Sequence, residues 1–166
     1  MALSAREGTL QLSIRAAVAS GASVGIAHLL ALPGPAYAMI AAIVVTDLSP
    51  QRTRAFGWRR IAGTIVGALI GGAVTAWLAP GAATVAFAVM GSMFACHLLR
   101  VGGGATISGI VAGLIVLEFS AEPWQFALER LAETLIGVVA AIAVSMVPKL
   151  IPHDAPSQGD EAPPAQ

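Results

Sequence analysis

Two arginines occupy equivalent positions in a motif that occurs twice, and a threonine accompanies each of them. The segment that holds Arg60 and Thr64 is matched, 70 residues further on, by the segment that holds Arg130 and Thr134. Each segment opens a predicted apolar helix, and a cation at a helix N-terminus opposes the macrodipole, which favours anions there. Each arginine therefore requires a carboxylate partner or an anionic substrate. The threonine hydroxyls either line a polar pathway or bond back to their own helix.

Two carboxylates are candidate partners for these arginines. Asp47 lies at the end of the second apolar run, and Glu118 lies at the end of the fifth. Each can face the arginine that opens the next helix on its own side of a membrane. Our hypothesis is that Asp47–Arg60 and Glu118–Arg130 are symmetry-related gate pairs that close opposite mouths of one pathway. The alternative is that all four are interfacial charges, which fix only the orientation and register of the helices.

Two further side chains have two interpretations each. Glu133 takes the place of Gly63 in the second copy of the motif, one turn into an apolar run, where ionisable groups are costly and usually functional. It either carries a coupling proton or pairs with Arg130 at i, i+3. Tyr37 stands at the start of the second apolar run. Its ring either stacks on an aromatic substrate or anchors the helix at the membrane interface.

The composition indicates the environment in which these residues act. Of the 166 residues, 57% are hydrophobic and 11% are charged, against about 25% charged in soluble domains, and the mean hydropathy is +0.81. The lipid bilayer is therefore the expected solvent. The net charge is zero, so nothing favours a nucleic-acid partner. The sequence has no metal-ligand cluster, nucleophile–base pair or cofactor motif, so we expect no metal, no cofactor and no enzyme activity.

Six apolar runs separated by proline, glycine or charged residues predict an all-α membrane protein. A helix needs roughly 20 apolar residues to cross a bilayer, with a range of about 17–25. Segment 1–11 is then a cytoplasmic N-terminus, 12–151 is the transmembrane domain, and the polar, proline-rich segment 152–166 is a disordered cytoplasmic tail. The predicted spans are about 12–32, 36–48, 60–79, 82–99, 104–119 and 128–148.

The cations orient these spans. Eight of the nine lysines and arginines fall on one side of a six-span bundle, and only Arg130 falls on the other. By the positive-inside rule both termini are cytoplasmic, as expected for a protein of the inner membrane. The basic segment 52–58 is expected to form a short surface helix on anionic lipid. The competing interpretation is a signal peptide cleaved near 36–38, which leaves five spans.

The 70-residue offset maps spans one to three onto spans four to six. Because three is an odd number, the second half lies upside down relative to the first. The pattern therefore predicts an inverted-topology repeat, with halves of about 12–80 and 82–150. Spans two and five are the two shortest, and short helices at equivalent positions of two halves indicate a transport site.

Glycines within the spans are packing candidates. Most of them recur every four residues, a spacing that lets two helices approach closely within one chain or across a dimer interface. The glycines in question are Gly63, Gly67, Gly71, Gly109, Gly113 and Gly137.

Segments 37–47 and 59–68 resemble the fusaric acid resistance protein-like family, which includes the aromatic acid exporters and is described as an integral membrane bound transporter domain. The most distinctive part is Arg-Ile-Ala-Gly-Thr-Ile-Val-Gly, at 60–67, and the resemblance covers roughly 12–148. It implies a six-span unit that exports weak organic acids, often aromatic, with the proton gradient as driving force. The related plant malate transporters imply a homodimer. The residues that match the family motif and its second copy are Asp47, Arg60, Thr64 and Gly67, then Arg130, Thr134 and Gly137.

These observations favour a transporter that exports small organic acid anions, aromatic ones included, and that works as a homodimer. The first alternative is a passive anion channel in which arginines set the selectivity. The second is a non-transporting membrane scaffold or accessory subunit, which predicts no polar side chains facing a central cavity. No sequence feature separates a carrier from a channel, although proton coupling through Glu133 favours a carrier.

Overall fold

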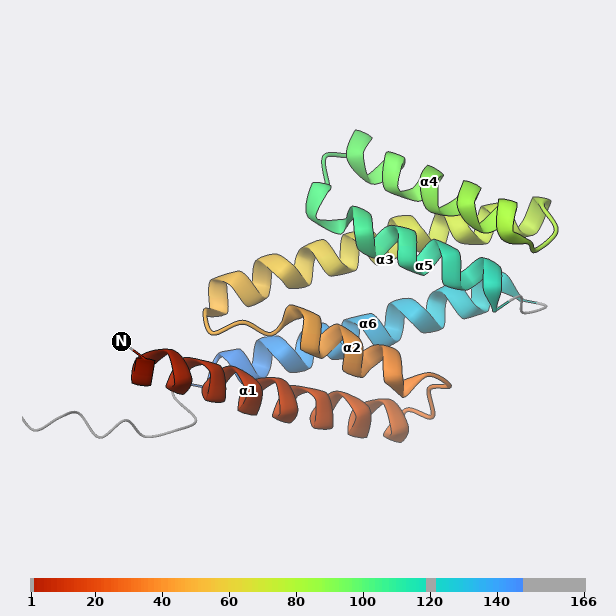
Figure 1. The fold of residues 1–166 in the computed structure, drawn as a ribbon. Helices are drawn as coiled ribbons and strands as arrows, with labels where there is room; N and C mark the ends of the chain where they lie inside the picture. The colour runs from red at the N-terminus through yellow and green to blue at the C-terminus, as the bar shows by residue number, and fades with distance from the viewer. Residues whose placement is uncertain (1, 119–121, 148–166) are drawn as a thin grey trace, which may run out of the picture.

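The computed structural model of the chain describes residues 2–118 and 122–147, and every regular element in them is helical (Figure 1). The all-α prediction is thus confirmed for these residues, while the predicted disordered tail at 152–166 lies outside them. The elements are α1 (Ala2–Leu29), α2 (Pro35–Val45), α3 (Pro50–Trp77), α4 (Ala82–Leu98), the short 3-10 helix η1 (Gly102–Gly104), α5 (Ala105–Leu117) and α6 (Pro123–Ser145).

Prolines begin three of the helices. Pro35, Pro50 and Pro123 are the first residues of α2, α3 and α6. The first position of a helix suits proline, because its ring presets the helical φ and the N–H that it lacks would have no partner within the helix. Each of these prolines therefore stands at a helix position that tolerates its ring. No proline interrupts a helix among the described residues.

Three helices begin earlier than the apolar pattern predicts. Helix α1 starts at Ala2 rather than at 12, so residues 2–11 of the predicted cytoplasmic N-terminus belong to a helix. The third span was expected from 60, but α3 starts at Pro50 and includes the segment 52–58, so the prediction of a separate surface helix there is wrong. No residue in that segment breaks a helix, and the helix that Pro50 begins continues through its charged side chains. Arg60 is consequently ten residues from the start of α3, about 15 Å along its axis at 1.5 Å per residue.

Arg130 is displaced in the same way. The sixth span was expected from 128, but α6 starts at Pro123, which places Arg130 seven residues from its start. The electrostatic effect of a helix terminus fades within the first turn. Neither arginine therefore opposes a helix dipole, contrary to the prediction, and their need for counterions depends on the groups that surround them.

The helices differ in how well they fit a bilayer. Among the described residues, two segments are long and apolar enough to cross one, Gly8–Leu29 and Pro50–Trp77. The apolar helices α2, α4 and α5 are shorter, and α2 and α5, with 11 and 13 residues, are the shortest α-helices. At 1.5 Å per residue they extend only about 16–20 Å, against roughly 30 Å of hydrocarbon. Helices α2 and α5 are thus short, as predicted for the second and fifth apolar runs.

The outer surface is apolar. Large hydrophobic side chains are exposed on every α-helix, with Trp77 89% exposed and Leu29 86% exposed. Exposed apolar surface on this scale is typical of a protein whose surroundings are lipid rather than water. The surface agrees with the prediction of a membrane protein.

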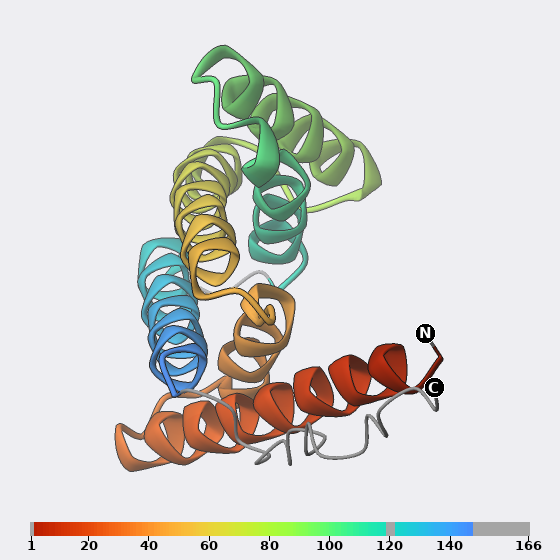
Figure 2. The ribbon, with the colours of Figure 1, turned by 90° about the vertical axis from the view of Figure 1, so that its left-hand side faces the viewer.

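The long helices α3 and α6 form the centre of the bundle and run antiparallel side by side (Figure 1). Helix α5 packs on α3 and α2 packs on α6, while α1 covers α2 and α6 and α4 covers α5 and α3. Figure 2 shows α1 and α4 at opposite ends of the helix bundle. Exchanging the first three helices for the last three leaves this set of neighbours unchanged.

Glycines make the two main crossings possible. A Cβ on Gly67 would lie 2.5 Å from the carbonyl oxygen of Ser108 in α5, and a Cβ on Gly137 would overlap the carbonyl oxygen of Ala38 in α2. Such distances are shorter than any real carbon–oxygen contact, so only glycine fits. Gly67 and Gly137 are 70 residues apart, and so are Ala38 and Ser108. The α3–α5 and α6–α2 crossings therefore use equivalent positions.

The other predicted packing glycines also face neighbouring helices of the same chain. Gly63 and Gly71 continue the stripe of Gly67 along η1 and α5, where a Cβ would meet the backbone of Gly104 and Ala112. On α5, Gly109 and Gly113 face Val89 and other side chains of α4. These six glycines thus serve packing within the chain.

Small residues fill the interior between these helices. One cluster joins α1, α2 and α6, a second joins α3, α5 and α6, and a third joins α4 and α5, with alanine in each. Alanine lets helices approach closely, and in lipid close packing rather than a hydrophobic drive holds helices together. The core is therefore spread along helix seams and leaves space between α2 and α5, which are not close neighbours among the described residues.

Candidate functional site

A hollow lies in this space between α2, α3, α5 and α6. We call it the central pocket, and its volume is about 180 Å³. Both arginines of the repeated motif line it. The lining residues are Tyr37, Ile40, Val44, Arg60, Ile110, Val111, Leu114, Arg130 and Thr134.

Arg130 is neutralised inside the protein. Its Nη2 donates a hydrogen bond to Oε1 of Glu133 at 3.1 Å, and its Nη1 lies 3.0 Å from Oε2. The second contact is an ion contact without hydrogen-bond geometry. The guanidinium also stacks on two rings, 3.7 Å from the centre of Tyr37 and 4.6 Å from that of Phe126. The i, i+3 pairing of Arg130 with Glu133 is thus confirmed.

Glu133 connects this ion pair to the start of α2. Its side chain is fully buried, and its Oε1 accepts a second hydrogen bond, from the backbone N–H of Gly34 at 2.8 Å. A buried carboxylate is costly unless it is paired and hydrogen-bonded, and Glu133 is both. A Cβ at Gly34 would collide with the Arg130 guanidinium, so any other residue there would displace that side chain from its present position.

Tyr37 extends the network to the end of α5. Its hydroxyl donates a hydrogen bond to Oε1 of Glu118 at 2.7 Å, while its ring covers Arg130. Glu118 is exposed and forms no ion pair with Arg130, so the predicted direct pair is absent among the described residues. A chain of contacts from Glu118 through Tyr37 and Arg130 to Glu133 takes its place.

Arg60 has none of these partners. Its side chain is only 8% exposed, and no described residue forms a hydrogen bond, ion pair or ring contact with it. The predicted partner Asp47 accepts a hydrogen bond from the N–H of Ser49 at 2.9 Å and caps the turn between α2 and α3. The Asp47–Arg60 gate pair is therefore wrong as a contact in this conformation, because the long α3 carries Arg60 away from that turn.

The two threonines of the motif differ as well. Thr64 is fully buried, and its hydroxyl bonds back to the carbonyl oxygen of Arg60 at 2.9 Å. Thr134 lines the central pocket. The two threonines are equivalent in the sequence but differ in the structure, because the Thr64 hydroxyl is bonded to the backbone of its own helix and only Thr134 lines the pocket.

The central pocket combines one unpaired cation with an apolar wall. A buried charge without a counterion is unfavourable, so Arg60 favours an anion in the adjacent hollow. Five aliphatic side chains from α2 and α5 and the Tyr37 ring form the remaining wall. The volume is below the range of about 300–1,000 Å³ that drug-sized ligands occupy. The arrangement suits a small anion with an apolar body.

Sequence reasoning missed these wall residues. Ile40, Val44, Ile110, Val111 and Leu114 look like any other apolar helix residue, because periodicity does not separate a pocket wall from a lipid-facing surface. The available signal is the 70-residue offset, which relates Ile40 to Ile110 and Val44 to Leu114 just as it relates the two arginines. Within the described ranges, no group of three acidic, histidine or cysteine residues is placed to hold a metal ion.

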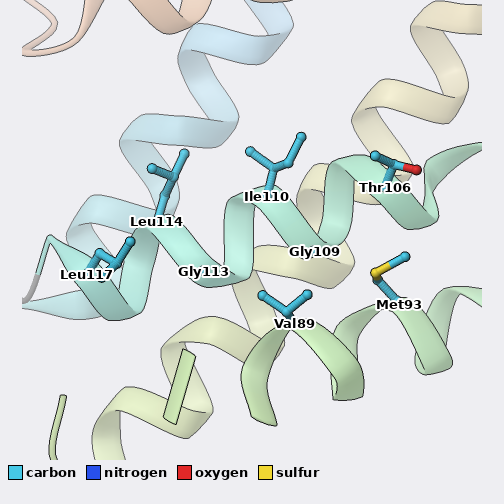
Figure 3. A pocket seen from close by; sticks show the side chains of 8 residues that line it. All are labelled: Val89, Met93, Thr106, Gly109, Ile110, Gly113, Leu114 and Leu117. Carbon is cyan, nitrogen blue, oxygen red and sulfur yellow. The ribbon is translucent and has the colours of Figure 1, made fainter. Parts of the chain in front are cut away.

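A second hollow lies between α4 and α5 and opens to the surface, with a volume of about 380 Å³ (Figure 3). Its side chains are aliphatic apart from Met93 and Thr106, and no charged residue of the described chain lines it. Figure 3 shows Ile110 and Leu114 on the side of α5 away from Val89 and Met93. It has nothing that can recognise an anion, so the smaller central pocket is the candidate site.

Comparison with known proteins identifies the family of the chain. The model of the fusaric acid resistance protein-like family matches residues 22–144, which include all six α-helices in whole or in part. No curated protein and no solved structure matches the chain. The matched segment contains the central pocket and both copies of the motif, and the family implies a general transporter-like role in a membrane. The chain therefore belongs to the fusaric acid resistance protein-like family.

Proposed function

We propose that this protein is a transporter that binds a small organic acid anion in the central pocket, with Arg60 as the contact for its carboxylate. The single observation that carries the proposal is the buried Arg60 guanidinium, which borders the pocket and has no counterion among the described residues. Guanidinium and carboxylate form two parallel charge-assisted hydrogen bonds, which makes a carboxylate a well-matched occupant.

The Arg130–Glu133 pair supports the choice of a carboxylate. It shows that a carboxylate reaches a guanidinium at the edge of the same pocket, at 3.0–3.1 Å. At Arg60 the protein supplies no such group, because the residue equivalent to Glu133 is Gly63. A substrate carboxylate would give Arg60 the counterion that Glu133 gives Arg130.

The remainder of the pocket supports an apolar, ring-sized body. Branched aliphatic side chains and the Tyr37 ring border the hollow, and aromatic rings pack favourably against each other and against aliphatic groups. Benzoate is therefore a suitable probe, since it has one carboxylate and a single ring. Membership of the family supports export, rather than uptake, of aromatic acids.

We further propose that α1–α3 and α4–α6 are inverted repeats and that both termini are cytoplasmic. The symmetric set of helix neighbours, the antiparallel α3 and α6 and the equivalent glycine crossings support the repeat. The distribution of cations supports the orientation in an inner membrane. A homodimer, each subunit with its own central pocket, is the assembly we propose.

Proteoliposomes test the transport proposal. We would measure the flux of labelled benzoate through the purified protein, with protein-free liposomes correcting for diffusion of the neutral acid. Arg60→Gln should lose most of the protein-dependent flux. The matched control is Arg59→Gln, because Arg59 is the neighbouring arginine but is exposed and does not line the pocket. Equal flux in wild type and Arg60→Gln would exclude Arg60 as the substrate contact.

The same assay separates the alternatives. Flux that a pH gradient drives against the benzoate gradient indicates a coupled carrier, whereas flux that only dissipates the benzoate gradient indicates a channel. Wild-type protein that conducts no benzoate or other organic anion would favour the scaffold instead.

A further inference from the structure

The central pocket contains two guanidinium groups but only one uncompensated positive charge. Arg130 is paired with Glu133, and Arg60 is unpaired among the described residues. This difference arises at one pair of equivalent positions, Gly63 in α3 and Glu133 in α6. The exposed Glu118 joins this network only indirectly, through the hydroxyl of Tyr37.

We propose that Glu133 is a specificity-determining residue, which limits the pocket to anions with one carboxylate by occupying Arg130 from inside the protein. The inference rests on the proposed function, because it takes Arg60 as the contact for the substrate carboxylate. Beyond that function, one internal side chain, Glu133, sets the number of carboxylates that the pocket accepts.

Packing fixes which half of the protein carries the internal carboxylate. A Cβ at Gly63 would run into the carbonyl oxygen of Gly104, because η1 and α5 lie directly against α3 there. At the equivalent place in the other half, Glu133 reaches the N–H of Gly34 at the start of α2. The carboxylate therefore fits in α6 but not in α3, and only Arg60 remains free for a ligand.

A second substrate carboxylate finds no unpaired cation in the wild-type pocket. It would meet aliphatic side chains, Thr134 or Tyr37, or approach Arg130, whose charge Glu133 already neutralises. A charged group buried without a counterion is costly. Removing the negative charge of Glu133 frees Arg130, and the pocket then offers two guanidinium groups to a ligand with two carboxylates.

Binding to the purified full-length protein in detergent tests the inference. Calorimetric titration would use butyrate and the dicarboxylates succinate, glutarate and adipate, at a pH where all are ionised. Butyrate and succinate have the same chain length and differ in one carboxylate, and the longer acids allow for the separation of the two arginines. Glu133→Gln removes the charge and keeps an oxygen that can accept the hydrogen bond from Gly34.

The expected result is a change in preference. Wild type should bind butyrate and discriminate against all three dicarboxylates, whereas Glu133→Gln should raise the affinity for the best dicarboxylate relative to butyrate about tenfold or more. The matched control is Glu129→Gln, because Glu129 lies one turn earlier on α6 and bonds to Gln125 rather than to an arginine. It should leave the ratio unchanged.

A double variant gives a second, independent result. Arg60→Gln should abolish binding of butyrate, and Arg60→Gln with Glu133→Gln should restore it, because Arg130 then becomes the single free cation. An unchanged ratio in folded Glu133→Gln, or no restoration in the folded double variant, overturns the inference while wild-type butyrate binding upholds the proposed function. If wild type binds no carboxylate at all, the proposed function fails first.

Discussion

Gly137 of α6 lies against the backbone carbonyl of Ala38 in α2, at a distance that leaves no room for a methyl group. This contact fixes how closely the helix that carries Arg130, Glu133 and Thr134 approaches the short helix that carries Tyr37. The width of the central pocket therefore depends on a residue that has no chemistry of its own.

Gly137→Ala is expected to destabilise the protein by about 1–3 kcal/mol or more, because the added methyl group forces α6 and α2 apart. The measurement is the thermal unfolding midpoint of the purified protein in detergent. The matched control is Gly21→Ala, since a Cβ on Gly21 of α1 meets no atom within 4 Å. There the substitution should be neutral or stabilising by about 0.5–1 kcal/mol, because alanine favours helix. A Gly137→Ala protein as stable as the Gly21→Ala protein would contradict the packing role.

Arg15 of α1 supports a second prediction. Its side chain is 5% exposed and donates hydrogen bonds to the carbonyl oxygens of Leu48 at 2.9 Å and Val147 at 3.2 Å, just beyond the ends of α2 and α6. Arg15→Lys should destabilise the protein by about 1.5–3 kcal/mol, because one ammonium group cannot match the fork that reaches both oxygens.

The readout for Arg15 is local as well as global. Hydrogen exchange should accelerate in the segments that follow α2 and α6, in addition to a lower unfolding midpoint. Arg54→Lys is the control, because Arg54 is exposed and its one hydrogen bond to a described residue is to the sulfur of Met146, at 3.9 Å. Unchanged exchange in both segments would show that Arg15 does not hold the two helix ends together.

The positions of the helices were largely predictable from the sequence. Proline, glycine and charge separate the apolar runs, and these same residues begin or end helices for steric reasons that do not depend on the rest of the fold. The predicted start of α3 was wrong because hydrophobicity marks where lipid contact begins, whereas the helix continues through the polar segment after Pro50.

The partners of the charged residues were predictable only where they are local. The Arg130–Glu133 pair follows from i, i+3 spacing on one helix. The stacking of Arg130 on Tyr37 and the hydrogen bond from Gly34 to Glu133 join residues about a hundred positions apart, and they depend on how α2 crosses α6. That crossing depends in turn on Gly137, whose role the repeat indicated but whose contact it did not reveal.

Tyr37 allows a test that separates its ring from its hydroxyl. Tyr37→Phe removes the hydrogen bond to the exposed Glu118 and keeps the ring over Arg130, so benzoate binding should change less than about threefold. Tyr37→Ala also removes the ring from the pocket wall and should weaken binding about tenfold. Calorimetric titration with benzoate measures both. Equal losses in the two variants would indicate that the Glu118 hydrogen bond, not the ring, matters for the ligand.

The proposed orientation predicts which loops face the cytoplasm. The lone cysteine, Cys96, is fully buried, so single cysteines introduced at exposed sites should give the main labelling signal in intact cells. Ala79 lies exposed in the loop between α3 and α4, on the predicted outer side, and Ala79→Cys should react with a membrane-impermeant maleimide added outside. Gln51 is exposed at the start of α3, and Gln51→Cys should react only after the membrane is permeabilised. The opposite pattern would place the termini outside and would overturn the proposed orientation.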